Sequence, residues 1–204
     1  MKLLRNLEFI KGQLSKVNRQ LGMTFIELVV VMSIFAIISG IALFNFGSFS
    51  DSIALQNLAQ DIALEIKQAQ SDAITGRNTG IFTGTCGAAP CRPAYGVYFE
   101  TSNPNQFISF ADVYNNGIFL SGNPIQDPTT TTITKGNVVS DLCAGDKITC
   151  QTASSLEISF VRPFPNAVIF SPIGPAVYAE ITIESPKGLK RVISVNSLGQ
   201  ISVK

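Results

Sequence analysis

A single acidic residue lies inside a long apolar stretch near the start of the chain. Residues 21–31 read LGMTFIELVVV, and Glu27 carries the one charge between Arg19 and Asp51. An acid at the centre of a membrane-spanning helix costs roughly 2.5–3.5 kcal/mol, so such residues usually have a partner or a function. A hydrated position at the membrane interface is the simple alternative, because Glu27 lies near the start of the stretch. Glu27 is therefore the first candidate functional residue.

The apolar stretch has the length of a membrane helix. Residues 24–46 read TFIELVVVMSIFAIISGIALFNF, and about 20 apolar residues cross a hydrocarbon core. Residues 1–20 hold five basic residues and one acid, Glu8. Basic flanks remain cytoplasmic, so we expect the N-terminus inside and everything after about residue 50 outside. A secretory signal would have a shorter apolar stretch, with a small-residue cleavage site after it.

LGMTFIELVVVMSIFAII resembles the signal of type IV prepilins and type II secretion pseudopilins. The resemblance implies that a membrane-embedded prepilin peptidase cuts between Gly22 and Met23 and methylates the new amine of Met23. The family most often has Phe at this position, so Met23 departs from the pattern. The resemblance also implies that Glu27 pairs, during assembly, with the protonated amine of a neighbouring subunit. Removing one partner of such a buried pair costs about 3–5 kcal/mol.

An amphipathic helix should follow the apolar stretch. Apolar residues recur at spacings of three and four in residues 51–73, which read DSIALQNLAQDIALEIKQAQSDA and predict one buried face. Gly76 is a plausible stop signal. A continuous helix over residues 24–74 would be on the order of 75 Å long, and Gly40 and Gly47 are positions where it could bend or melt.

Residues 81–204 contain short runs typical of strands, separated by Gly, Pro, Asn and Ser. The predicted strands are residues 81–83, 95–99, 107–110, 117–120, 133–135, 156–160, 167–170, 177–183, 191–195 and 201–203. The threonine run at 129–132 is interpreted as a surface loop. An antiparallel meander packed on one helix is the simplest arrangement. The expected fold class is therefore α+β and pilin-like, with a long N-terminal helix packed on an antiparallel sheet domain.

The expected organisation is a cleaved cytoplasmic leader (1–22), a transmembrane and assembly helix (23–47) and an extracytoplasmic globular domain (48–204). YGVYFE, ISFADVYNNGIF and RVISVNSLGQISVK are similar in order and spacing to the minor pseudopilin H class and FimT-like minor pilins. These motifs have low specificity, so a major pilin or another pseudopilin class is the main alternative.

Four cysteines occur in two close pairs, Cys86 with Cys91 and Cys143 with Cys150. Outside the cytoplasm an even number of cysteines suggests disulfides, and the short loops favour these two local pairings. A four-cysteine zinc site is disfavoured, because its ligand pairs usually lie two to four residues apart. We expect no metal and no cofactor.

Oxygen side chains precede a glycine in DVYNNG, residues 112–117. They could ligate Ca²⁺, but a hairpin turn with Asn116-Gly117 at positive φ explains them more simply. The sequence has no histidine, which removes the commonest general base. No nucleophile elbow or phosphate loop is present either, so enzymatic activity is not expected.

The expected function is a structural minor pilin or pseudopilin of a type II secretion pseudopilus or a type IV pilus, anchored in the bacterial inner membrane. Its expected partners are the prepilin peptidase, other pilin or pseudopilin subunits and membrane lipid. One alternative is a DNA-binding minor pilin, although Lys187, Lys190, Arg191 and Lys204 give a thin basic surface for phosphate contacts. The other alternative is a permanently anchored protein with an extracytoplasmic binding domain.

Overall fold

The computed structural model describes residues 22–77, 85–86, 89–90, 93–112, 118–120 and 128–204. The chain divides into two compact units, of which the first ends at Phe46 and the second is Gly47–Lys204. The fold is α+β, with a long N-terminal helix followed by antiparallel sheets.

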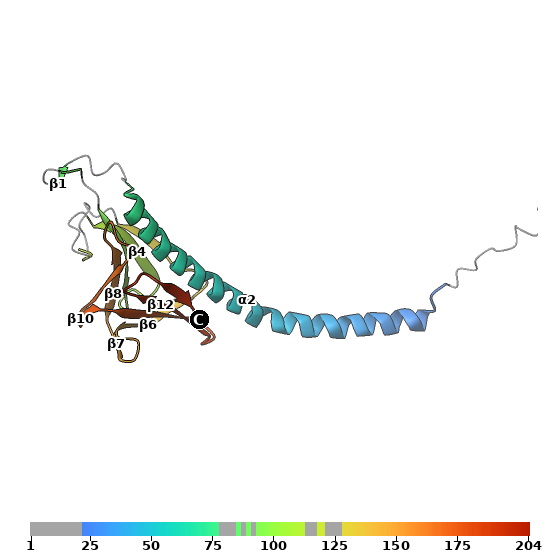
Figure 1. Ribbon diagram of the computed structural model, residues 1–204. Helices are drawn as coiled ribbons and strands as arrows, with labels where there is room; N and C mark the ends of the chain where they lie inside the picture. The colour runs from blue at the N-terminus through green and yellow to red at the C-terminus, as the bar shows by residue number, and fades with distance from the viewer. Residues whose placement is uncertain (1–21, 78–84, 87–88, 91–92, 113–117, 121–127) are drawn as a thin grey trace, which may run out of the picture. The chain divides into compact units, whose positions relative to one another are not determined.

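Helix α2 (Phe25–Thr75) runs without interruption through Gly40 and Gly47, where the sequence allowed a bend or a melted turn (Figure 1). It ends in a Schellman motif at Gly76, which has a φ of 64°. The Gly76 N–H donates to the Ala73 carbonyl at 3.3 Å, and the Arg77 N–H donates to the Asp72 carbonyl at 3.1 Å. These two bonds satisfy carbonyls that a helix end otherwise leaves without partners.

The larger sheet has six antiparallel strands in the order β10-β9-β8-β3-β4-β5. Its strands are β3 (Ala94–Glu100), β4 (Gln106–Asp112), β5 (Thr129–Thr132), β8 (Ser155–Phe160), β9 (Ala167–Ser171) and β10 (Gly174–Ala176). Its centre joins segments far apart in sequence, because β3 pairs with β8 so that Val97 lies opposite Ile158.

The second sheet has five antiparallel strands in the order β13-β12-β11-β6-β7. Its strands are β6 (Val138–Gly145), β7 (Cys150–Thr152), β11 (Tyr178–Glu184), β12 (Lys190–Asn196) and β13 (Ile201–Val203). A separate two-stranded ladder pairs β1 (Thr85–Cys86) with β2 (Ala89–Pro90).

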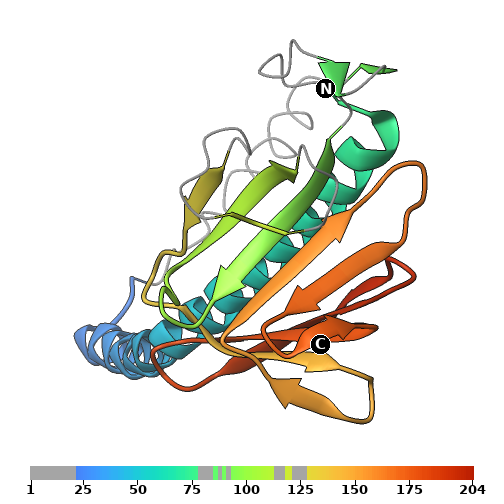
Figure 2. The same cartoon turned by 90° about the vertical axis from the view of Figure 1, so that its left-hand side faces the viewer.

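One hydrophobic core joins the second half of α2 to both larger sheets (Figure 2). The helix contributes Leu55, Ala59, Ile62, Ala63, Ile66, Ala69 and Ala73, all buried. In β11 the buried Ala179, Ile181 and Ile183 alternate with half-buried Glu180 and Thr182, and this element confirms the strand predicted at residues 177–183. The buried stripe predicted on α2 is also confirmed.

Several strand predictions need correction. Residues 133–135 are not a strand, whereas the threonine run interpreted as a loop forms β5 at the edge of the six-stranded sheet. Threonine is β-branched and suits an extended strand even when its side chain is exposed. Residues 118–120 are not in a strand. The predicted strand at 81–83 lies outside the described residues.

Candidate processing and assembly segment

The start of α2 is capped by a threonine. The Thr24 hydroxyl accepts a hydrogen bond from the Glu27 N–H at 3.3 Å, and the Thr24 carbonyl accepts one from the Leu28 N–H at 3.1 Å. Thr24 is therefore the N-cap, and Glu27 lies three residues later in the Thr-x-x-Glu order of a capping box. A carboxylate in this first turn interacts favourably with the positive end of the helix dipole.

Gly22 and Met23 lie directly before this cap in a non-helical segment. Among the described residues, no atom lies within 4 Å of the position that a Cβ on Gly22 would take. The fold around Gly22 therefore has room for a side chain, so packing within the chain does not require a glycine there. Met23 is 60% exposed.

The first part of α2 presents apolar side chains to its surroundings. Residues Phe25–Leu43 are long and apolar enough to cross a membrane, and none of this segment is buried within the protein. The Ser33 hydroxyl donates to the Val29 carbonyl at 2.8 Å, so this polar group is satisfied within the helix, as a lipid environment requires. The segment therefore combines two features: an exposed apolar helix that is capped by Thr24, and a non-helical Gly22-Met23 junction directly before the cap.

Residues 17–43 match the prokaryotic N-terminal methylation motif. This is the signal of type IV pilins and pseudopilins, so the chain carries the marker of a processed, pilin-like structural subunit rather than that of an enzyme. The methylation motif and the apolar helix together fit an inner-membrane anchor. No match was found among curated proteins or among solved structures.

The cysteine predictions concern two separate hairpins. Cys143 and Cys150 form a disulfide with a Cα–Cα distance of 5.5 Å, one of the two local pairings favoured by the sequence. It closes the turn between β6 and β7. Cys86 lies in β1, but Cys91 is outside the described residues, so the second pairing stays a prediction.

The basic residues near the C-terminus are largely compensated by neighbouring groups. Lys187 pairs with Asp51 at 2.8 Å, and Lys190 pairs with Glu184 at 3.2 Å. Lys204 Nζ lies 3.7 Å from a carboxylate oxygen of Glu180, and Arg191 Nε donates to Gln56 at 3.0 Å. Phosphate binding would have to compete with these contacts, which weakens the case for nucleic-acid binding.

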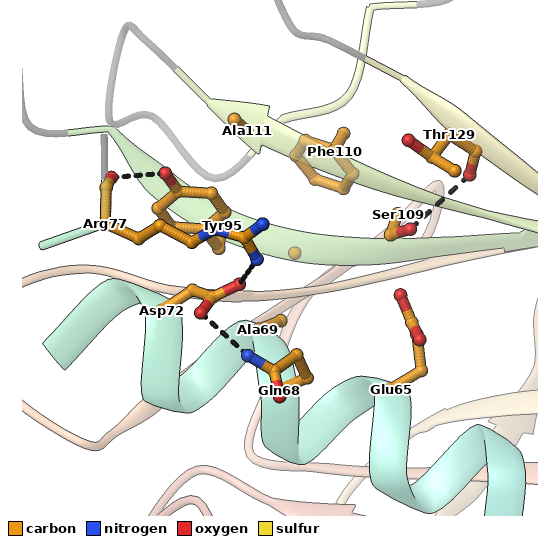
Figure 3. A pocket seen from close by; sticks show the side chains of 11 residues that line it. Glu65, Gln68, Ala69, Asp72, Arg77, Tyr95, Ser109, Phe110, Ala111 and Thr129 are labelled. Carbon is orange, nitrogen blue, oxygen red and sulfur yellow. Dashed lines mark hydrogen bonds and ion pairs between the residues drawn. The ribbon is translucent and has the colours of Figure 1, made fainter. Parts of the chain in front are cut away.

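A polar hollow of about 210 Å³ lies between α2 and strands β3–β5 (Figure 3). Asp72 accepts a hydrogen bond from Gln68 at 2.8 Å and pairs with Arg77 at 3.0 Å. The hydrogen bond and the charge of Asp72 raise the pKa of Arg77, and the Tyr95 hydroxyl donates to the Arg77 carbonyl. These contacts fix the position of the chain at the end of α2. The residues that line the hollow therefore help to stabilise the fold.

The sequence did not predict that Asp72, Arg77 and Tyr95 lie close together. The available signals were local, namely the four-residue spacing of Gln68 and Asp72 and the stop at Gly76. The contact with Tyr95 depends on how β3 packs near the end of α2, and local sequence patterns do not record such a contact.

The six-stranded sheet also buries an unusual carboxyl group. Glu157 in β8 is 7% exposed, and its carboxylate accepts a hydrogen bond from the Phe119 N–H at 3.1 Å. Burial raises the pKa of Glu157 to about 7, the hydrogen bond from Phe119 opposes the shift, and the charge of Asp112 adds to it. The Phe119 ring lies 4.8 Å from the Tyr98 ring and 5.2 Å from the Phe110 ring, between centroids.

The calcium-binding alternative concerns residues 112–117, of which the structure describes only Asp112. Asp112 ends β4 and is fully buried, whereas the other five positions lie outside the described residues. Within the described ranges, no group of three or more His, Cys, Asp or Glu side chains has an arrangement that could hold a metal ion.

Proposed function

We propose that the chain is a structural subunit of a type II secretion pseudopilus or a type IV pilus, in a minor or tip-complex position. The observation that supports this proposal is the match of residues 17–43 to the methylation motif. The accessible junction before the capped start of α2 is consistent with it. In this proposal a prepilin peptidase cuts between Gly22 and Met23 and methylates Met23.

The proposed organisation follows from that cut. Residues 1–22 are the cytoplasmic leader, residues 23–47 form the transmembrane and assembly helix, and residues 48–204 are the extracytoplasmic domain. Assembly moves the apolar part of α2 from lipid into the filament, where Glu27 of an incoming subunit pairs with the Met23 amine of a neighbour. The pair gives assembly a defined register, because both charges must find each other in an apolar setting.

Mass spectrometry of the mature N-terminus tests the proposal. We expect the first residue to be N-methylated Met23, and we expect a bulky replacement such as Gly22→Phe to leave the leader attached. Gly40→Ala is the matched control, since Gly40 lies inside the apolar helix and no described atom lies within 4 Å of where its Cβ would be. A mature wild-type chain that still begins at Met1 would instead support a permanently anchored binding protein.

A further inference from the structure

The two edges of the six-stranded sheet end in different ways. Strand β10, at one edge, contains Pro175, which has no main-chain N–H to offer a further strand. Strand β5, at the other edge, consists of four threonines whose side chains are all exposed. It contains neither a proline nor a charged residue, the residues that usually keep an exposed edge from pairing with another chain. Strand β5 is therefore the edge of this sheet that can accept an added strand.

The register shows which main-chain groups of β5 point away from the sheet. Opposite residues in an antiparallel pair alternate between hydrogen-bonded and non-hydrogen-bonded pairs. Thr132 lies opposite Gln106, and the next residue, Ile133, donates its N–H to the Asn105 carbonyl at 2.7 Å. Thr132 and, by alternation, Thr130 therefore direct their N–H and carbonyl groups away from β4. No described residue outside the ladder hydrogen-bonds to these outward groups.

A hollow lies between α2 and this edge of the sheet. It is the polar hollow of about 210 Å³ whose lining runs from α2 across β3 and β4 to Thr129 of β5. Glu65 is half-buried, and its side chain points from α2 toward Ser109 and Thr129 (Figure 3). Successive side chains of a strand point to opposite faces, so every second side chain of a strand added to β5 faces α2 and this hollow.

The charges that line the hollow leave one carboxylate over. Glu65, Asp72 and Arg77 are its charged lining residues. Asp72 and Arg77 pair with each other at 3.0 Å, whereas Glu65 forms no ion pair within the described residues. The next hollow along α2 is lined by Asp61 and Lys135, whose charges offset each other. A lysine or arginine is therefore the side chain that complements the hollow beside β5.

We propose that β5 accepts an added strand from a different protein, with a lysine or arginine of that strand beside Glu65. The outward main-chain groups of Thr130 and Thr132 bond the added strand, and Glu65 pairs with its basic side chain. In this mode of peptide recognition, main-chain bonds supply affinity and the alternate side-chain positions supply specificity. The contact goes beyond the proposed function, because it concerns the globular unit and does not require removal of the leader.

Segments of the chain itself fit this edge less well. Residues 113–117 and 121–127, which lie between β4 and β5 in sequence, contain no lysine or arginine. Strand β5 of a second copy brings four threonines and likewise no positive charge, so it would leave Glu65 without a partner. A basic strand of a different protein is therefore the occupant that fits both the edge and the hollow.

The test uses the full-length chain in the cells that produce it, with a photo-crosslinking amino acid at position 132. We expect a covalent adduct with a different protein, and mass spectrometry should place the cross-link in a segment that contains a lysine or arginine. Glu65→Lys should lower the adduct yield at least about tenfold, because like charges then meet. Changing the partner's lysine or arginine to glutamate should restore the yield in that variant.

Asp141→Lys is the matched control for the charge. It reverses an exposed carboxylate in β6, outside both hollows, and should leave the adduct yield unchanged.

A second pair of variants tests the main-chain bonds. Thr130→Pro removes an outward N–H but no ladder bond to β4, and it should lower the adduct yield about tenfold. Thr130→Val keeps that N–H and should keep the yield, and thermal unfolding of both variants checks that the fold is retained. In the free chain, the Thr130 and Thr132 amides should exchange hydrogen faster than those of Thr129 and Thr131, which bond β4.

Cross-links of position 132 only to lipid, to its own chain or to a second copy would overturn the inference, as would the lack of any adduct. A yield that is insensitive to Glu65→Lys, or to Thr130→Pro with the fold retained, would also overturn it. The mature N-terminus of the same samples reports the proposed function separately. A cut at Gly22 without the adduct removes only the strand contact, whereas the adduct on a chain with an uncut leader removes only the assembly function.

Discussion

Glu157 is an ionisable residue at a buried position, where its charged form is unfavourable. Its pKa is raised from 4.5 to about 7, mainly by burial, so the folded protein holds this proton more tightly than the unfolded chain. The contribution to stability is therefore complete below about pH 4.5 and is lost as the pH rises toward 7. Over that window we expect the free energy of unfolding to fall by on the order of 2–3 kcal/mol from this group.

Glu157→Gln should remove this pH dependence and stabilise the protein at pH 8. The glutamine amide oxygen can still accept the hydrogen bond from the Phe119 N–H, but it carries no charge to bury. Urea unfolding of the full chain, followed by near-ultraviolet circular dichroism at pH 5 and pH 8, measures the difference. Glu65→Gln, at a more exposed site, is the control and should leave the slope unchanged. An unaltered slope in Glu157→Gln would contradict the assignment.

In the proposed function, Glu27 pairs with the Met23 amine of a neighbouring subunit, and this amine forms only when the leader is removed. Glu27→Ala should leave cleavage at Gly22 largely intact but reduce incorporation into filaments at least about tenfold, since an unpaired buried amine costs about 3–5 kcal/mol. Quantifying the subunit in sheared filaments against the membrane pool measures this. Ser33→Ala is the control within the same helix, because the Ser33 hydroxyl bonds only its own helix backbone among the described residues. Normal incorporation of Glu27→Ala would remove the pairing.

At the scale of elements, the β6–β7 hairpin depends on its cross-link. Cys143→Ser/Cys150→Ser should lower the free energy of unfolding by roughly 2–3 kcal/mol, because the unfolded chain regains the freedom of a short loop. The thermal midpoint with and without the two changes measures the loss. The Val177 N–H also donates a hydrogen bond to the Gly145 carbonyl at 3.2 Å, and a midpoint that does not move would show that such main-chain bonds hold the turn without the disulfide.

The end of α2 depends on a glycine. Gly76 has a positive φ, which costs a residue with a side chain roughly 1–2 kcal/mol, and a Cβ there would also displace the Arg162 guanidinium. Gly76→Ala should therefore destabilise the globular unit by about that amount in chemical unfolding. Gly40→Ala should have no such effect, because no described atom crowds that position.

Elements with strong local signals were predictable from the sequence. Helix α2 was expected over residues 24–74 and spans Phe25–Thr75, because apolar periodicity and the stop at Gly76 are encoded locally. Strands β3, β8 and β11 were found for the same reason. Strand β6 was missed because Ser140 and Asp141 interrupt its apolar residues, and its pairing with β11 supplies the order that its own sequence lacks.

At the scale of the whole molecule, the division of the strands between two sheets was not predictable. A single meander was expected, but β6 and β7 join the five-stranded sheet, while β8 returns to pair with β3. This choice depends on contacts between residues far apart in sequence, which no local pattern records. The methylation motif was predictable from its residues, because a processing signal is short and local, whereas the hollow between α2 and β3–β5 exists only when segments far apart in sequence pack together.

The pairing of β3 with β8 and of β6 with β11 has a consequence for export. Neither sheet can close early, because each needs strands from the last third of the chain, and contacts of this range slow folding. If residues cross the membrane in order, the first strands emerge long before their partners and wait unpaired at the outer surface. In the proposed topology, the apolar helix would hold the unfinished domain at the membrane surface while it folds, before the same helix takes part in assembly.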